Sequence, residues 1–328
     1  MMAGKGFSRR ALVVGAGAAT LASCAPRAAG RFGRLRIGYQ KNGVLLLAQT
    51  GGRLPQRLAS TGVAGVDWAQ FGSGPPMLEA MRAGAIDFGA VGDTPPIFAQ
   101  AAGSSIIYAA VQTLTGKGQG LLVKASSAFH AVSDLKGRRI AFTKASSAHL
   151  FVVQALTKAG LTLGDITPVY LSPTDAAAAF ANGAVDGWAV WDPYFAIAQQ
   201  AGGSRLIVDG RGVAPTNSFY IASQSFAASA PTVLNSLLDA LAAEAAWGNA
   251  HQTAAAATIQ AATGLPSDIV AIALQRGPFV VAPVTDAVTR IQQANADVFK
   301  RLGIIPAAVD VRSASWTRWA PATTPANI

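Results

Sequence analysis

The chain contains two copies of one segment, and this repeat limits the folds that are open to it. Residues 84–103 and 183–202 are identical at 10 of 20 aligned positions, with an offset of 99 residues. A second, shorter match lies upstream of each copy, at residues 36–41 and 139–144. Alanine-rich composition raises chance identity, but the matched Gly, Asp and Gln positions are harder to attribute to composition. The repeat therefore predicts two lobes of similar architecture.

Each copy is predicted to contain a strand, a helix and a second strand that leads into another helix. Alternating strands and helices are typical of open parallel sheets. We therefore expect an α/β fold with two lobes, each an open sheet flanked by helices, and a cleft between them. The first lobe is expected to comprise residues 34–118 and 222–328, and the second residues 119–221. The chain would cross between them near 118–122 and again near 219–223.

Local signals place three of the helices. Ser172 is a suitable N-cap before Pro173, and a helix from there is predicted to end near residues 182–183, Asn-Gly. The Ala-rich residues 231–248 and 252–263 predict two long helices. These two helices are expected to complete the first lobe.

The first 25 residues have the pattern of an export signal. Arg9 and Arg10 precede a modest apolar run and then small residues. The arginine pair resembles a twin-arginine signal. The letters LASC, which end at Cys24, resemble the lipobox of bacterial lipoproteins. Residues 1–23 are therefore predicted to be removed and Cys24 to be acylated, with ordinary export and an incidental cysteine as the alternative.

Composition and charge narrow the class of protein. The chain is 51% hydrophobic and 13% charged, which is typical of an ordered globular protein. Its longest uncharged run is interrupted by Pro, Gly and Ser, which favours packed core elements over a bilayer helix. The net charge of +10 falls to +7 without the signal and its three basic residues. That surplus favours an anionic ligand or an anionic membrane surface, with nucleic acid as a weaker idea.

The sequence lacks the patterns of common catalytic and metal sites. Cys24 is the only cysteine, so the predicted fold has no disulfide, no cysteine cluster for zinc and no thiol nucleophile. His130, His149 and His251 are scattered, without metal-ligand spacing. His149 is the best candidate for a functional histidine, although a packing or capping role is equally open.

Polar residues follow the ends of four predicted strands, at residues 40–43, 92–94, 143–147 and 191–192. In open α/β sheets, ligands bind beyond the carboxyl ends of the strands. Two of these loops lead into helices, whose first N–H groups and positive dipole ends favour anions. The sequence therefore predicts an anion site shared by the two lobes.

Individual residues in these loops have predicted roles. The candidate donors are hydroxyl side chains at helix starts, each of which could instead simply cap its helix: Thr94, Ser146 and Ser147. Asp93 and Asp192 would repel an anion, so we expect them to accept from backbone amides or a nearby base such as Lys41, behind the site. Trp191 is expected to form a cleft wall against an alkyl group.

Several of these segments resemble a known family. GYQK, GAIDFGAVGDTPPIFAQAAG, DLKGRRIAFTKASSAH and YLSPTDAAAAFANGAVDGWAVWDPY resemble the aliphatic sulfonate-binding proteins of bacterial ABC importers, and the resemblance spans residues 35–316. It implies a type II periplasmic-binding-protein fold that closes around its ligand through two hinge crossings. The residues that it implies for ligand binding are Gln40, Asp93, Thr94, Ser146, Ser147, Trp191 and, as a looser match, Ser218. Asp192 joins this set from the strand-end pattern.

The chain departs from the family pattern in places that bear on ligand preference. Ala148 stands where the family often has a third serine, and Asn217 where it often has glycine. The usual Arg-Pro-Pro segment is Arg-Gly-Pro at residues 276–278. Taurine-, nitrate- and pyrimidine-binding relatives share the architecture, so the preferred ligand stays open.

The resemblance implies an extracytoplasmic component that captures an alkanesulfonate and delivers it to an ABC permease in sulfur metabolism. Such a protein acts as a monomer, in the periplasm or anchored through Cys24 at the outer face of the cytoplasmic membrane, and uses no metal, cofactor or nucleic acid. An enzyme on the same scaffold, desulfinase-like or pyrimidine-synthase-like, is the second interpretation. It would need a reactive cysteine or histidine, and Asp87 and Asp186, within matching predicted strands, favour a structural role over acid–base catalysis. A scaffold or sensor without a small ligand is the third.

Overall fold

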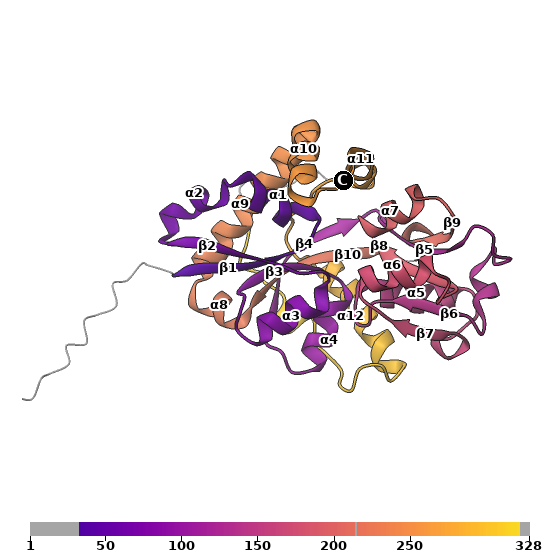
Figure 1. Ribbon diagram of the computed structural model, residues 1–328. Coiled ribbons are helices and arrows are strands. Elements are labelled where there is room, and N and C mark those ends of the chain that lie inside the picture. Colours follow the sequence, from indigo (N-terminus) through magenta and orange to yellow (C-terminus); the bar gives the residue numbers. More distant parts are fainter. Residues whose placement is uncertain (1–32, 214, 322–328) are drawn as a thin grey trace, which may run out of the picture. The chain divides into compact units, whose positions relative to one another are not determined.

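The computed structural model describes residues 33–213 and 215–321. Figure 1 shows the arrangement of the helices and strands in this part of the chain. The predicted signal at residues 1–23 and the predicted lipidation site at Cys24 lie outside the described residues.

The first of two sheets has the strand order β2-β1-β3-β10-β4. Its strands are β1 Arg34–Tyr39, β2 Gly65–Gln70, β3 Phe88–Gly92, β4 Ile106–Leu114 and β10 Thr216–Ser223. β1 pairs in parallel with β2 and β3, whereas β10 is antiparallel to both β3 and β4. This sheet and its helices are called the first lobe below.

The second sheet repeats the same plan, with the strand order β7-β6-β8-β5-β9. Its strands are β5 Gln119–Lys124, β6 Arg139–Phe142, β7 Thr167–Tyr170, β8 Gly187–Trp191 and β9 Ser204–Asp209. β6 pairs in parallel with β7 and β8, and β5 is antiparallel to β8 and β9. This sheet and its helices are called the second lobe. The repeat in the sequence is therefore a repeat in the fold.

Two expectations about the sheets need correction. Both sheets are mixed, because β5 and β10 enter their sheets from the other lobe and run against the parallel strands. The chain also returns to the first sheet earlier than expected, because Thr216 already pairs with Leu114 of β4. The residues from Thr216 onward thus belong with the first sheet, rather than those from 222.

Helices cover both sheets (Figure 1). The first lobe contains α1 Gly43–Gly51, α2 Leu54–Leu58, α3 Gly74–Arg82, α4 Thr94–Ala101, α8 Gln224–Ser229, α9 Pro231–Ala250, α10 Gln252–Thr263, α11 Ser267–Gln275 and α12 Asp286–Arg301. The second lobe contains α5 Ser147–Lys158, α6 Pro173–Ala181 and α7 Tyr194–Gln200. The three helices predicted from local signals are confirmed as α6, α9 and α10, and the Ser172 hydroxyl caps α6 by accepting from the Asp175 amide at 3.2 Å.

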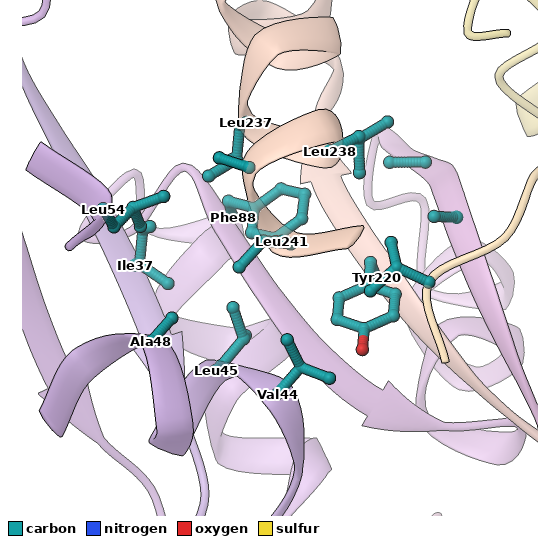
Figure 2. Packing of buried hydrophobic residues seen from close by; sticks show 14 of the residues in the cluster. Ile37, Val44, Leu45, Ala48, Leu54, Phe88, Tyr220, Leu237, Leu238 and Leu241 are labelled. Atoms are coloured by element: carbon teal, nitrogen blue, oxygen red, sulfur yellow. The ribbon is translucent and has the colours of Figure 1, made fainter. Parts of the chain in front are cut away.

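The main core of the first lobe lies between its sheet and helices α1 and α9. Figure 2 shows Ile37 and Phe88 from the sheet facing Leu45 of α1 and Leu237 and Leu241 of α9. Each of these side chains is fully buried. Burying one such side chain stabilises the fold by about 1.5–3 kcal/mol, so the core fixes α1 and α9 against the sheet. It thereby fixes the β1–α1 turn, which carries Gln40.

A matching ion pair joins two strands in each lobe. Arg36 donates from its backbone N–H to Asp87 Oδ2 at 2.9 Å and from its guanidinium to Oδ1. Arg139 makes the same two bonds to Asp186, at 2.8 and 3.1 Å. Both carboxylates lie immediately before β3 and β8, rather than within the strands as expected, and each accepts from a backbone amide of the neighbouring strand. The expected structural role fits these contacts.

The two lobes pack against each other beside the crossings. Leu150 and Val153 of α5 belong to one hydrophobic cluster with Ile97 of α4 and Phe299 of α12. This contact holds the amino end of α5 beside the first lobe. Over residues 33–213 and 215–321, every helix is too short or too polar to span a bilayer.

Candidate ligand site

A cavity of about 230 Å³ lies between the lobes, at the carboxyl ends of strands from both sheets. The polar residues that line it are Gln40, Lys41, Asn42, Gln112, Thr113, Thr115, Thr216, Ser218, Tyr220 and Arg276 from the first lobe and Gln119, Ser146, Ser147, Trp191 and Asp192 from the second. Six of the predicted site residues therefore lie together: Gln40, Ser146, Ser147, Trp191, Asp192 and Ser218. The structure places the other two, Asp93 and Thr94, elsewhere.

The second lobe presents the start of α5 to the cavity. Ser146 is the N-cap residue, and its hydroxyl donates to the Thr143 carbonyl at 2.7 Å, so it stabilises the turn. In the first helical turn the His149 N–H donates to the Ser146 carbonyl at 2.9 Å. The N–H groups that precede it have no acceptor within the helix, which leaves them for an anion or water. Ser147 adds a partly exposed hydroxyl at the same place. This turn has the expected chemistry of an anion site.

The first lobe meets this turn at Gly92. A methyl group on Gly92 would lie 2.9 Å from Ser147 Cβ and 3.0 Å from Ser147 Oγ. Such contacts are too close for a side chain, so glycine is required for the observed approach of β3 to α5. The end of β3 in the first lobe therefore lies against the start of α5 in the second.

Asp93 and Thr94 do not line the cavity. Their exposed fractions are 1% and 0%, and the Thr94 hydroxyl donates to Asp93 Oδ1 at 2.9 Å. Gln292 of α12 donates to the Asp93 carbonyl at 2.6 Å, so neighbouring side chains cover this turn. The expectation of direct ligand contact by these two side chains is not met by this geometry. Lys41 lies on the cavity wall and is not the partner of Asp93.

The environment of Asp93 strongly favours its neutral form. Burial raises the pKa of the Asp93 carboxyl to about 7, against the lowering effect of hydrogen bonds from Thr94 and nearby backbone amides. Within the described residues, Asp93 Oδ2 has no hydrogen-bond partner. Asp93 therefore brings little negative charge toward the cavity at mildly acidic pH.

Asp192 has a basic partner that the sequence reasoning missed. Arg276, which follows α11, donates to Asp192 Oδ1 at 2.6 Å, and its guanidinium lies 4.5 Å from the ring centre of Phe195. Asn42 donates to the Asp192 carbonyl at 3.0 Å, so two residues of the first lobe hold this strand end. Burial raises the pKa of Asp192, although Arg276 opposes that change. The only signal in the sequence was the unusual segment at residues 276–278.

Part of the cavity wall is apolar and comes from α10, α11 and the segments beside them. Its residues are Ile259, Leu265, Val270, Ala273, Leu274 and Phe279. These residues lie far along the chain from the polar loops, and sequence reasoning did not place them at the site. The cavity is therefore lined by polar strand-end residues and also by an apolar wall.

His149 has a packing role. Its ring is fully buried among Phe142 and Tyr170 of the second lobe and Phe98 and Phe299 of the first. The Ala145 amide donates to His149 Nδ1 at 3.3 Å, which supports the loop before α5. Burial lowers the pKa of His149 to about 4.

The metal-binding residue types do not gather in the described part of the chain. There, groups of three or more His, Cys, Asp or Glu side chains that could hold a metal ion are absent.

Comparison with known proteins gives the family. The model of the NMT1-like family matches residues 41–263. The chain belongs to this family. Among solved structures of similar proteins, the periplasmic aliphatic sulphonate binding protein SsuA from Escherichia coli is 39% identical, with a TM-score of 0.79. The match covers 87% of this chain and 98% of that one.

Two further structures define how far this likeness extends. The alkanesulfonate-binding protein SsuA from Xanthomonas axonopodis pv. citri, solved with bound MOPS, is 39% identical with a TM-score of 0.84. That match covers 88% of this chain and 99% of the other. The desulfurization enzyme DSZB is 18% identical with a TM-score of 0.63, over 89% of this chain and 97% of that one, and shares the fold alone. The predicted family and fold class are confirmed.

Proposed function

We propose that this member of the NMT1-like family is the substrate-binding component of an ABC importer and captures aliphatic sulfonates. The observation that carries the proposal is the cavity between the lobes, which is lined both by helix-start donors and by an apolar wall. The two similar SsuA proteins are sulfonate-binding proteins, which supports the same ligand class.

The chemistry of a sulfonate suits the polar residues of the cavity. A sulfonate stays ionised at physiological pH and offers only acceptors, which matches the α5 amides and the hydroxyls of Ser147 and Ser218. Gln40 adds an amide, one hydrogen of which donates to the Ala90 carbonyl at 3.1 Å. Charge-assisted hydrogen bonds contribute about 1.5–3 kcal/mol each, so four or five support an affinity of roughly micromolar after ordering costs.

The apolar wall favours an alkyl chain over a small or zwitterionic ligand. Leu265, Val270 and Leu274 offer neither donors nor acceptors to an amine such as that of taurine. Nitrate has no alkyl group and would make no apolar contact with this wall. We therefore rank alkanesulfonates above taurine and nitrate for this cavity.

An enzyme on this scaffold is the weaker proposal. Across the described residues, the cavity wall includes neither cysteine nor histidine, and His149 is fully buried away from it. Incubation with an arylsulfinate and assay of released sulfite tests the alternative. Sulfite release would replace the binding function with a desulfinase.

We further propose that the protein is exported and acts outside the cytoplasm as a monomer. The support is the twin-arginine pattern at Arg9 and Arg10 and the lipobox-like residues before Cys24. An acylated Cys24 would anchor the chain at the outer face of the cytoplasmic membrane, next to its permease. Mass spectrometry of the membrane fraction is expected to find a lipid-modified N-terminus at Cys24, and an unmodified, soluble chain would contradict the anchor.

The function is tested by calorimetry of the purified protein with hexanesulfonate, taurine, nitrate and sulfate. Hexanesulfonate is expected to bind most tightly, because it alone uses both the polar residues and the apolar wall of the cavity. Absence of heat with any alkanesulfonate would refute the ligand class.

Replacement of one hydroxyl sharpens the same test. Ser147→Ala is expected to weaken hexanesulfonate binding by about 1–3 kcal/mol, because it removes one donor beside the α5 amides. Ser126→Ala, at an exposed serine outside the cavity, is the matched control and should bind as the wild type does. An unchanged affinity of Ser147→Ala would remove this hydroxyl from the site.

A further inference from the structure

Two buried donors on the cavity wall have no partner. Gln119 and Thr216 line the cavity, and their exposed fractions are only 6% and 5%. Within the part of the chain that the structure describes, Gln119 Nε2 and Thr216 Oγ1 make no hydrogen bond. Buried polar groups are normally paired, since an unpaired one retains its full desolvation penalty. A partner from outside the protein is therefore expected at these two atoms.

The register of the strands places Gln119 on the side of its sheet that lines the cavity. Gln119 is the first residue of β5 and lies opposite Trp191 of β8, which also lines the cavity. Residues directly opposite in an antiparallel pair project on the same side of the sheet. In the first lobe, Ser218 of β10 lies opposite Gly92 in the same way. Because residues 92 and 191 occupy the same position in the repeat, Gln119 is the second lobe's counterpart of Ser218.

Thr216 lies on the same face of β10 as Ser218. Side chains alternate along a strand, so residues two apart project on one side of the sheet. Thr216 lies opposite Leu114 of β4, which lines the cavity as well. Both orphan donors therefore occupy the first residue of a strand that carries the chain from one lobe into the other.

We propose that Gln119 and Thr216 contact the ligand directly and donate hydrogen bonds to its anionic oxygens. This assignment rests on the proposed function and extends it to two residues beyond the strand-end loops. A sulfonate offers acceptors alone, and the two orphan groups are an amide N–H and a hydroxyl that can donate. Each crossing strand then supplies one donor, so the ligand is held at the axis about which the lobes would move.

The test compares apolar and conservative variants of both residues. Gln119→Leu and Thr216→Val are each expected to weaken hexanesulfonate binding roughly 10- to 100-fold in calorimetry, because a hydrogen bond to a charged group is lost. The melting temperature of the ligand-free variants should stay the same or rise, because an unpaired buried group is removed. Thr216→Ser keeps the hydroxyl and should retain affinity within about threefold of the wild type. Gln224→Leu and Thr174→Val, at exposed positions, are the matched controls.

Each outcome decides the matter. Weakened binding by the apolar variants at an unchanged or raised melting temperature supports both contacts. Wild-type affinity in Gln119→Leu and Thr216→Val overturns the contacts while the proposed function stands. A lowered melting temperature, failure to fold, or equal loss of affinity in Thr216→Ser and Thr216→Val shows a structural role and also overturns them. If the wild type binds no alkanesulfonate, the proposed function and the contacts fall together.

Discussion

Asp93 and Asp192 occupy the same position in the two copies of the repeat, yet their surroundings differ. Asp93 is held inside the first lobe by the Thr94 hydroxyl, without a basic partner for its carboxylate among the described residues. Asp192 pairs with Arg276, which comes from the other lobe. One carboxylate is thus an internal part of its own lobe, and the other connects the two lobes.

The difference separates the framework of the repeat from its site. The ion pairs of Arg36 with Asp87 and Arg139 with Asp186 are alike in both lobes. In each sheet the pair joins the same two neighbouring strands. At the strand ends the lobes have different tasks. One end is sealed under α12, and the other forms part of the cavity wall. Equal position in a repeat therefore predicts equal backbone geometry but not equal chemistry.

The largest expected effect is at the link between the lobes. Arg276→Met keeps much of the apolar stem that lies over Phe195 but leaves Asp192 without its counter-charge. Removal of one partner from a buried pair costs about 3–5 kcal/mol, and urea unfolding should show a loss of this size. Arg82→Met, which breaks the exposed pair with Glu79, is the control and should cost under about 1 kcal/mol. Equal losses of the free energy of unfolding in the two variants would mean that Arg276 does not stabilise the buried Asp192 carboxylate.

A smaller effect, visible as a pH dependence, is expected at Asp93. Its folded pKa of about 7 lies above the ordinary value of 3.8, so the folded state holds a proton that the unfolded state loses between these values. This contribution to stability is fully present below pH 3.8 and is lost as the pH rises to 7. Asp93→Asn stays neutral, so its free energy of unfolding relative to the wild type should rise by roughly 2–4 kcal/mol across this window.

Urea unfolding at several pH values between 4 and 7.5 measures this difference. Asp192→Asn is the comparison at the matched position. It should lower stability across the whole range, because it removes the partner of Arg276. If the free energies of unfolding of Asp93→Asn and the wild type differed by the same amount at every pH, the raised pKa of Asp93 would be contradicted.

The smallest effects are expected where the lobes are alike. Asp87→Asn and Asp186→Asn should each lower the free energy of unfolding by about 1–2 kcal/mol, because each weakens one pair that also accepts a backbone amide. The loss should be larger for Asp87, whose side chain is 11% exposed, than for Asp186, at 27%. Thermal or urea unfolding of both variants checks the order. A markedly larger loss at Asp186 would show that the two pairs are not equivalent.

Much of the fold could be predicted because its signals are local or repeated. The repeat gave two similar lobes, and Ser172 with Pro173 placed α6 to within a residue. The antiparallel course of β5 and β10 could not be predicted in the same way. The direction of a crossing strand depends on which lobe the chain comes from. The residues of β5 and β10 themselves do not indicate this direction.

The candidate site was predicted in part for the same reason. Ser146, Ser147 and Trp191 follow strands directly, so strand ends located them. Thr94 also follows a strand but is fully buried, in a turn where Gln292, nearly 200 residues away in the sequence, donates to the Asp93 carbonyl. Arg276 and the apolar wall of α10 and α11 come to the cavity through tertiary packing alone. An unpaired buried donor such as Gln119 Nε2 can be identified only from the hydrogen bonds of the folded protein.

The close approach at Gly92 has a consequence for how the site can vary. A single methyl group there would act as a spacer, because it would meet Ser147 well before the opposing surfaces touch. Every contact that bridges the gap would lengthen together, whichever residue makes it. The fit of the pocket to its ligand therefore depends on the absence of a side chain at residue 92. Substitutions elsewhere on the wall can change ligand selectivity only while residue 92 remains glycine.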